Sequence, residues 1–109
     1  MDYKSTENWV LSRLPSYQAI GIKAYNPGLK NVVKFVSTLN LPVDSLNLIH
    51  VGGTNGKGST SSYISSILQE SNYQVGIFSS PHFFDFRERI KINNQKISKS
   101  FIVDFVNKY

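Results

Sequence analysis

The chain has 109 residues, of which 40% are apolar, 13% aromatic and 17% charged, and this composition excludes a disordered chain and fits one small globular domain or a piece of a larger one. The net charge is +5 and there are no cysteines, which excludes disulfides, zinc–thiolate sites and thiol nucleophiles. Because the sequence shows neither a secretory signal nor an apolar run long enough to cross a bilayer, we expect a cytoplasmic protein without a membrane partner.

The first part of the chain predicts two helices joined by a loop. Residues 6–14 form a short helix that Pro15 ends. Residues 15–28 are rich in Pro and Gly, which predicts a loop with bends. Residues 29–39 carry apolar side chains at helical spacing and predict an amphipathic helix of about three turns.

The centre of the chain predicts a strand, a loop, a helix and a second strand. Residues 46–51 are a short apolar run that ends at two glycines, which is typical of a buried strand. The helix after the glycines has an apolar face and a serine-rich face, and it ends near Asn72. Residues 75–78 predict a second buried strand. We expect the two strands to pair in parallel through a right-handed crossover.

The last third predicts a loop, a hairpin and a helix. Residues 79–87 are a loop with Pro81 and several phenylalanines, and residues 89–97 alternate around Asn93-Asn94, a turn that tolerates positive φ. Ser98 is placed to cap a final helix. The sequence therefore predicts an α/β fold with a parallel P-loop core, flanking helices and a small β-hairpin. Because that helix runs to the last residue without a stop signal, we expect an incomplete domain.

The strongest motif spans residues 52–60, with the sequence Gly-Gly-Thr-Asn-Gly-Lys-Gly-Ser-Thr. Glycines let backbone N–H groups turn toward a polyphosphate, and the following helix dipole favours negative charge. Lys57 can bring its charge to the β- and γ-phosphates. The motif departs from the common P-loop, because Val51 stands where the first glycine belongs and Gly58 follows the lysine. The alternative is a glycine-rich turn with an exposed lysine, which the flanking strand and helix disfavour.

This departure carries a resemblance to a known family. Gly53-Thr54-Asn55-Gly56-Lys57 resembles the ATP loop of the Mur ligases, and the continuation Gly58-Ser59 resembles their folylpolyglutamate synthase/dihydrofolate synthase branch. The strand that precedes the ATP loop in that branch is similar to residues 49–51. A mobile loop of the branch is similar to residues 79–82, and the strand after the mobile loop is similar to residues 85–90. Leu14-Pro15 and Ala24-Tyr25 are similar to the branch's N-terminal segment, so the resemblance spans nearly the whole chain.

The resemblance implies an ATP-dependent ligase with the Mur ligase central-domain fold. Residues 1–109 would form the N-terminal part of its ATP-binding domain. ATP would phosphorylate a pterin-bearing carboxylate, and the amine of L-glutamate would attack the acyl phosphate, with dihydropteroate or a reduced folate as the other substrate. The implied cofactors are ATP and Mg²⁺, and the full-length enzyme is expected to be a monomer.

The same resemblance assigns the site residues. Lys57 is the expected catalytic residue, and Ser80 is the expected ligand of Mg²⁺. The expected nucleotide-binding residues form one continuous stretch: Gly53, Thr54, Asn55, Gly56, Lys57, Gly58, Ser59 and Thr60. The family's acidic metal ligand, metal-ligating histidine, modified lysine and C-terminal domain would lie beyond residue 109, so we expect this chain alone to be inactive.

Several other side chains have open assignments. His50 is expected to be a buried core histidine, and His82 is given no chemistry. The two arginines of residues 85–90 either reach an anionic substrate or pair with the neighbouring carboxylates. The phenylalanines of residues 83–86 either stack on a pterin or pack. Lys23 and Tyr25 lie in a segment that lines the pterin site in relatives.

Three other functions compete with this interpretation. A cell-wall Mur ligase shares the Gly-Thr-Asn-Gly-Lys loop, but usually has Thr directly after the lysine. A truncated, non-catalytic remnant would bind nucleotide or nothing. A nucleic-acid module rests only on the +5 charge and the aromatic content; because the basic residues are scattered, we expect a solvated basic surface and no nucleic-acid partner.

Overall fold

The computed structural model describes residues 1–13 and 28–109. The chain divides into two units, which we call the main unit (Met1–Arg13 with Val51–Tyr109) and the small unit (Leu14–His50), and of the small unit only residues 28–50 are described. The helices and strands of the main unit are α1 (Tyr3–Arg13), α4 (Lys57–Glu70), β1 (Gly76–Phe78), the 3-10 helix η3 (Phe86–Arg89), β2 (Ile90–Ile92), β3 (Gln95–Lys96) and α5 (Lys99–Lys108).

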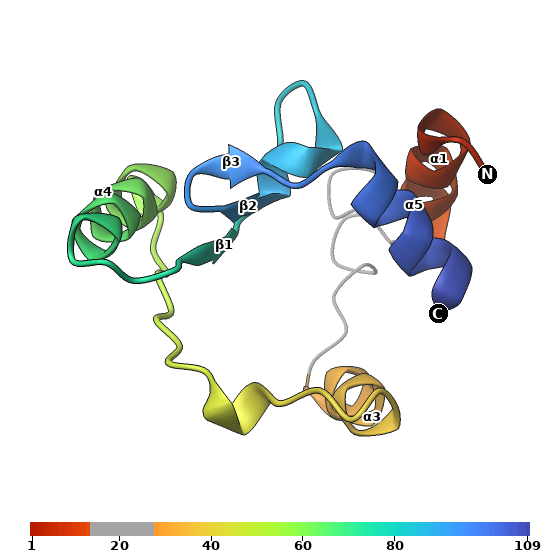
Figure 1. Cartoon of the computed structure of the whole chain (residues 1–109), viewed down its shortest axis with the longest axis horizontal. Coiled ribbons are helices and arrows are strands. Elements are labelled where there is room, and N and C mark those ends of the chain that lie inside the picture. The colour runs from red at the N-terminus through yellow and green to blue at the C-terminus, as the bar shows by residue number, and fades with distance from the viewer. Residues whose placement is uncertain (14–27) are drawn as a thin grey trace. The chain divides into compact units, whose positions relative to one another are not determined.

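The sheet of the main unit has the strand order β1-β2-β3, and both pairs are antiparallel (Figure 1). Ile77 lies opposite Lys91, and Ile92 lies opposite Gln95. The turn between β2 and β3 places Asn93 at φ 48° and Asn94 at φ 64°, as a two-residue turn that matches the strand twist requires. The predicted hairpin is therefore confirmed.

The predicted parallel pair is wrong for this chain, although the α/β class is confirmed. Residues 47–50 form no strand, and the partner of β1 is β2, which follows it along the chain. An apolar run predicts a buried strand only where other elements cover it. Here Leu46, Leu48 and Ile49 are 58%, 73% and 61% exposed, so among the described residues no layer covers this apolar run.

The core of the main unit lies where α1 and α5 pack side by side next to η3 and β2 (Figure 1). Ile97 and Ile102 are its buried apolar side chains among the described residues. An apolar pocket of about 180 Å³ adjoins them. It is lined by Val10, Phe86, Ile90, Ile97, Phe101, Ile102, Phe105 and Val106. The predicted cap of α5 is confirmed, because the Ser98 hydroxyl accepts a hydrogen bond from the Phe101 N–H at 3.0 Å.

The hairpin turn holds α4 and the start of β1 in place. The buried Ser65 hydroxyl donates to Asn94 Oδ1 at 3.3 Å and accepts from Gln69 Nε2 at 2.9 Å. Asn93 Oδ1 accepts from the Val75 N–H at 2.9 Å. These side-chain bonds connect the helix that begins at the glycine-rich loop to the sheet.

The small unit contains α3 (Lys30–Thr38) and the 3-10 helix η2 (Val43–Ser45). The helix predicted over residues 29–39 is thus confirmed, and its apolar side chains, such as Val32 and Val33, are exposed. The predicted loop over residues 15–28 lies, except for Gly28, outside the described residues, as do Lys23 and Tyr25. Within the described ranges, none of the helices is both long and apolar enough to cross a membrane.

Candidate nucleotide-binding site

The glycine-rich loop leads directly into α4. Gly56 is the N-cap of this 14-residue helix and has φ 78°, in the left-handed region. Gly53 has φ 150°. A side chain at either position would strain the backbone, which explains why glycine stands there. The loop before the helix therefore contains two backbone conformations that residues other than glycine rarely adopt.

The first turn of α4 presents backbone donors and contains no acidic residue. The first α-helical hydrogen bond at this end runs from the Thr60 N–H to the Gly56 carbonyl at 2.9 Å. The N–H groups of Lys57, Gly58 and Ser59 precede it, and the helix has no side-chain cap and no acidic residue in its first turn. Such free donors, together with the helix dipole, favour an anion such as a phosphate group.

Lys57 lies over the loop in the structure. Its ammonium nitrogen donates to the Gly53 carbonyl at 2.6 Å and to the Thr54 carbonyl at 3.2 Å. The side chain is exposed, so a bound phosphate can replace these carbonyl acceptors without burying an unpaired charge. The structure thus brings Lys57 and the predicted loop glycines together in one small region.

Ser80 lies in the exposed loop that follows β1. Among the hydrogen bonds of the described residues, none joins Ser80 to residues 53–60, so the structure does not itself connect the predicted metal ligand with the phosphate loop. The described residues also hold no group of three or more His, Cys, Asp or Glu side chains suited to a metal. Of the described residues, Ser80 alone would give a Mg²⁺ ion one oxygen ligand, and nucleotide phosphates and water would have to supply others.

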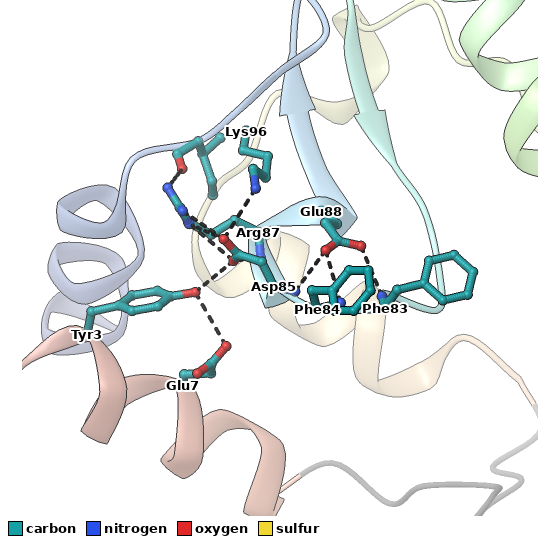
Figure 2. Close-up of polar contacts among 9 residues, drawn as sticks. Tyr3, Glu7, Phe83, Phe84, Asp85, Arg87, Glu88 and Lys96 are labelled. Carbon is teal, nitrogen blue, oxygen red and sulfur yellow. Dashed lines mark hydrogen bonds and ion pairs between the residues drawn. The ribbon is translucent and has the colours of Figure 1, made fainter.

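Glu88 shapes the loop beyond Ser80. Its carboxylate accepts the backbone N–H groups of Phe83, Phe84 and Asp85 at 2.9, 3.0 and 2.8 Å. These backbone hydrogen bonds, that from Phe83 first, lower the pKa of Glu88 below its ordinary value. Figure 2 shows the phenyl rings of Phe83 and Phe84 beside this carboxylate, and they are 83% and 98% exposed.

Asp85 connects the same loop to α1 and to Arg87 (Figure 2). Its carboxylate accepts from the Arg87 guanidinium at 2.7 Å, from the Lys96 ammonium at 3.4 Å and from the Tyr3 hydroxyl at 3.2 Å. The hydrogen bond from Arg87 holds the pKa of Asp85 well below its ordinary value. Burial, with the nearby Glu7 and Asp85 carboxylates, raises the pKa of Tyr3 to about 12. The Arg87 guanidinium is therefore committed to a structural ion pair.

The other open assignments are resolved unevenly. The expected burial of His50 is wrong, since its side chain is exposed. Arg89 bonds His82 instead of Glu88. Phe86 lines the apolar pocket, whereas Phe83 and Phe84 do not pack. Sequence reasoning missed Tyr3, although the Asp85-x-x-Glu88 spacing, which forms a capping box here, is a recognisable signal for the turn that Tyr3 contacts.

No protein-family model matches the sequence, but individual relatives do. The chain is 41% identical over 96 residues to dihydrofolate synthase/folylpolyglutamate synthase from Bacillus subtilis, which covers 88% of this chain and 21% of that protein. It is 54% identical over 56 residues to human mitochondrial folylpolyglutamate synthase, covering 51% of this chain and 10% of that protein.

Solved structures agree with the sequence comparison. Folylpolyglutamate synthetase from Lactobacillus casei matches with a TM-score of 0.82 and 30% identity, over 98% of this chain and 25% of that one. Folylpolyglutamate synthase from Thermotoga maritima matches with a TM-score of 0.65 and 37% identity, over 77% of this chain and 22% of that one. By sequence and by structure, the chain therefore belongs with the folylpolyglutamate and dihydrofolate synthases, and it spans a quarter or less of the length of these relatives.

Proposed function

We propose that residues 1–109 are the N-terminal part of the ATP-binding domain of a cytoplasmic ligase. This ligase joins L-glutamate to dihydropteroate, to a reduced folate or to both, with ATP and Mg²⁺. The observation that carries the proposal is the loop of residues 53–60. It combines two positive-φ glycines, an exposed lysine and a helix N-terminus with no acidic residue in its first turn. The relatives named for the same chemistry support it.

The roles of the chain's own residues follow from this geometry. The free N–H groups at the start of α4 and the loop backbone bind and orient the phosphates of ATP. Lys57 leaves the Gly53 and Thr54 carbonyls and places its charge where negative charge develops on the transferred phosphoryl group. Ser80 supplies one oxygen ligand to the Mg²⁺ ion. When bound, such an ion would supply positive charge that stabilises the phosphate oxygens.

These residues bind and orient a nucleotide, but they contain no evident base for the incoming amine and no site for the carboxylate substrate. We propose that the base and the rest of the carboxylate site belong to segments outside residues 1–109, and that the chain on its own binds MgATP without ligating glutamate. The proposed assembly of the whole enzyme is a monomer.

The first test is nucleotide binding by calorimetry. We expect MgATP to bind the chain, and Lys57→Ala to weaken binding at least tenfold, because a charged hydrogen bond contributes roughly 1.5–3 kcal/mol and each 1.4 kcal/mol is about tenfold in affinity. Lys34→Ala in α3 removes the same charge at a residue outside the loop sequence and serves as the matched control. Equal affinity for the wild type and Lys57→Ala would remove the phosphate-loop assignment.

Substrate dependence separates the proposed enzyme from a cell-wall ligase. ATP turnover by the intact gene product should require L-glutamate and either dihydropteroate or a reduced folate. Turnover that instead requires a UDP-linked muropeptide would assign the chain to the cell-wall branch.

A further inference from the structure

One residue, Arg89, holds the chain on both sides of Ser80. Its backbone carbonyl accepts the N–H of Ser79, immediately before Ser80, at 2.9 Å. Its side-chain Nε donates to Nδ1 of His82, two residues after Ser80, at 2.7 Å. The Ser80-Pro81 step between these two bonds is therefore fixed at both ends by the last residue of η3.

The side chains that make this contact rest on the core. The Arg89 guanidinium carbon lies 5.9 Å from the centroid of the Phe86 ring, and the His82 ring meets the same ring edge-on at a centroid distance of 5.9 Å. Phe86 lines the apolar pocket beside Ile97 and Ile102, which are the buried apolar side chains of the described core. His82 is therefore held against the core through Phe86, and not by the exposed residues of the loop.

The direction of the hydrogen bond fixes the chemistry of the histidine. A guanidinium group only donates hydrogen bonds, so Nδ1 of His82 must be the acceptor, and the proton of the neutral ring is on Nε2. The ring therefore serves Arg89 as an acceptor, and its Nε2 is a donor that cannot ligate a metal while it carries the proton.

We propose that Arg89 is a positioning residue for Ser80, acting through its bond to His82. It holds the Ser80 turn in one shape before the nucleotide arrives, and so lowers the conformational cost of placing the Ser80 hydroxyl against a phosphate-bound Mg²⁺ ion. Glu88 fixes residues 83–85 in the same loop, because its carboxylate accepts their three backbone N–H groups. This inference rests on the proposed function, in which Ser80 is a metal ligand.

The test uses the intact gene product and two pairs of variants. Arg89→Met keeps a long apolar stem over Phe86 but removes the donor, and Arg13→Met is the matched control, because Arg13 lies at the end of α1 over Trp9. His82→Asn retains an acceptor close to the position of Nδ1, whereas His82→Leu removes it at similar size. The readouts are the Mg²⁺ concentration at half-saturation of MgATP binding, hydrogen exchange over residues 79–85, and the NMR signals of the His82 ring nitrogens.

We expect Arg89→Met and His82→Leu each to raise the required Mg²⁺ concentration about tenfold, the effect of losing one charged hydrogen bond, and to accelerate exchange in residues 79–85. In both variants, the affinity for ATP without metal and the exchange rates in α4 should stay at wild-type values. The Arg13→Met control should match the wild type in every measurement. His82→Asn should stay within about threefold of wild type, because it keeps the acceptor. The wild-type spectrum should show the Nε2–H form of His82.

Unchanged Mg²⁺ dependence in Arg89→Met and His82→Leu, while the wild type binds MgATP, would overturn this inference and leave the proposed function standing. A loss in His82→Asn as large as in His82→Leu would also overturn it, since the ring would then act by itself. If the wild type bound no MgATP at all, the proposed function would fail and the inference with it.

Discussion

The hydroxyl of Tyr3 is a direct link between α1 and the loop that carries the proposed metal ligand. Tyr3→Phe removes this hydroxyl and keeps the ring, which lies 5.8 Å from the Arg87 guanidinium carbon and 5.2 Å from the Lys99 ammonium. The hydroxyl lies 3.2 Å from Asp85 Oδ1 and 3.5 Å from Glu7 Oε1. The substitution therefore removes the hydrogen bond between α1 and Asp85, together with the longer one to Glu7 inside α1, with little change in packing.

The geometry sets the size of the expected effect. A hydrogen bond to a charged group contributes about 1.5–3 kcal/mol, but 3.2 Å is long for an O–H···O bond. A contribution of about 1–1.4 kcal/mol, just below that range, corresponds to about a five- to tenfold change in an equilibrium constant. We therefore expect α1 to open five to ten times more often, at unchanged stability of α4.

Hydrogen exchange followed by mass spectrometry measures this opening directly, because local exchange reports local unfolding. Amides of α1 in Tyr3→Phe should exchange about five to ten times faster than in the wild type. Tyr63→Phe removes the same atom from a ring that is 71% exposed on α4 and is the matched control. Unchanged exchange in α1, or an equal acceleration in α4, would refute the idea that this hydroxyl connects α1 to the loop.

Three further predictions follow from the same contacts. Burial and the adjacent carboxylates raise the pKa of Tyr3 to about 12. Its contribution to the free energy of unfolding is therefore complete below pH 10 and lost as the pH rises toward 12. Ultraviolet titration should show a late tyrosine step that Tyr3→Phe abolishes. The hydrogen bond from Arg87 lowers the pKa of Asp85, so the contribution of Asp85 to the free energy of unfolding is present above the ordinary carboxyl pKa of 3.8 and lost as the pH falls below it. Asp85→Asn should reduce stability to urea at pH 7 and flatten this acid dependence. An unchanged dependence of stability on pH would contradict this role of Asp85. Gly56→Ala should destabilise the first turn of α4 by about 1–2 kcal/mol because φ is 78°, whereas Gly58→Ala, inside the helix with open space around it, should be neutral or stabilising by up to about 1 kcal/mol; equal exchange rates at the start of α4 in both variants would contradict this.

Local chemistry made much of the fold predictable. The Asn93-Asn94 turn and the Ser98 cap are determined by residues that are close in sequence. Turn preference depends on the backbone φ angles that a residue tolerates, and cap preference depends on one nearby hydrogen bond. The helix after the glycine-rich loop was predicted from its apolar and serine faces for the same reason, and it ends at Glu70 with Asn72 at positive φ.

Features that depend on distant parts of the chain were predicted poorly. Residues 46–51 have the pattern of a buried strand, but burial needs a covering layer, and a pattern within one segment does not show whether that layer is present. The contact of Tyr3 with Asp85 joins residues 82 positions apart and has no local signature. The bond from Arg89 to His82 was missed because nearby carboxylates were the more obvious partners for an arginine.

The candidate site likewise contains one part that the local sequence predicts and one part that it does not. The phosphate loop is a continuous stretch, so its residues were predictable together, and the positive φ of Gly53 and Gly56 gives a physical reason for that sequence. Ser80 was assigned only by resemblance. Its role stays a prediction, because a single hydroxyl does not define a metal site without the phosphates that would share the ion.

The most direct test of the central claim is the mass of the product formed by the intact gene product from ATP, L-glutamate and either dihydropteroate or a reduced folate. We expect a pterin product heavier by one glutamyl residue for each addition, formed only with ATP present and lost in Lys57→Ala. If the pterin substrates stay unchanged in mass while the protein binds and turns over ATP with another acceptor, the proposed glutamate ligase function is wrong.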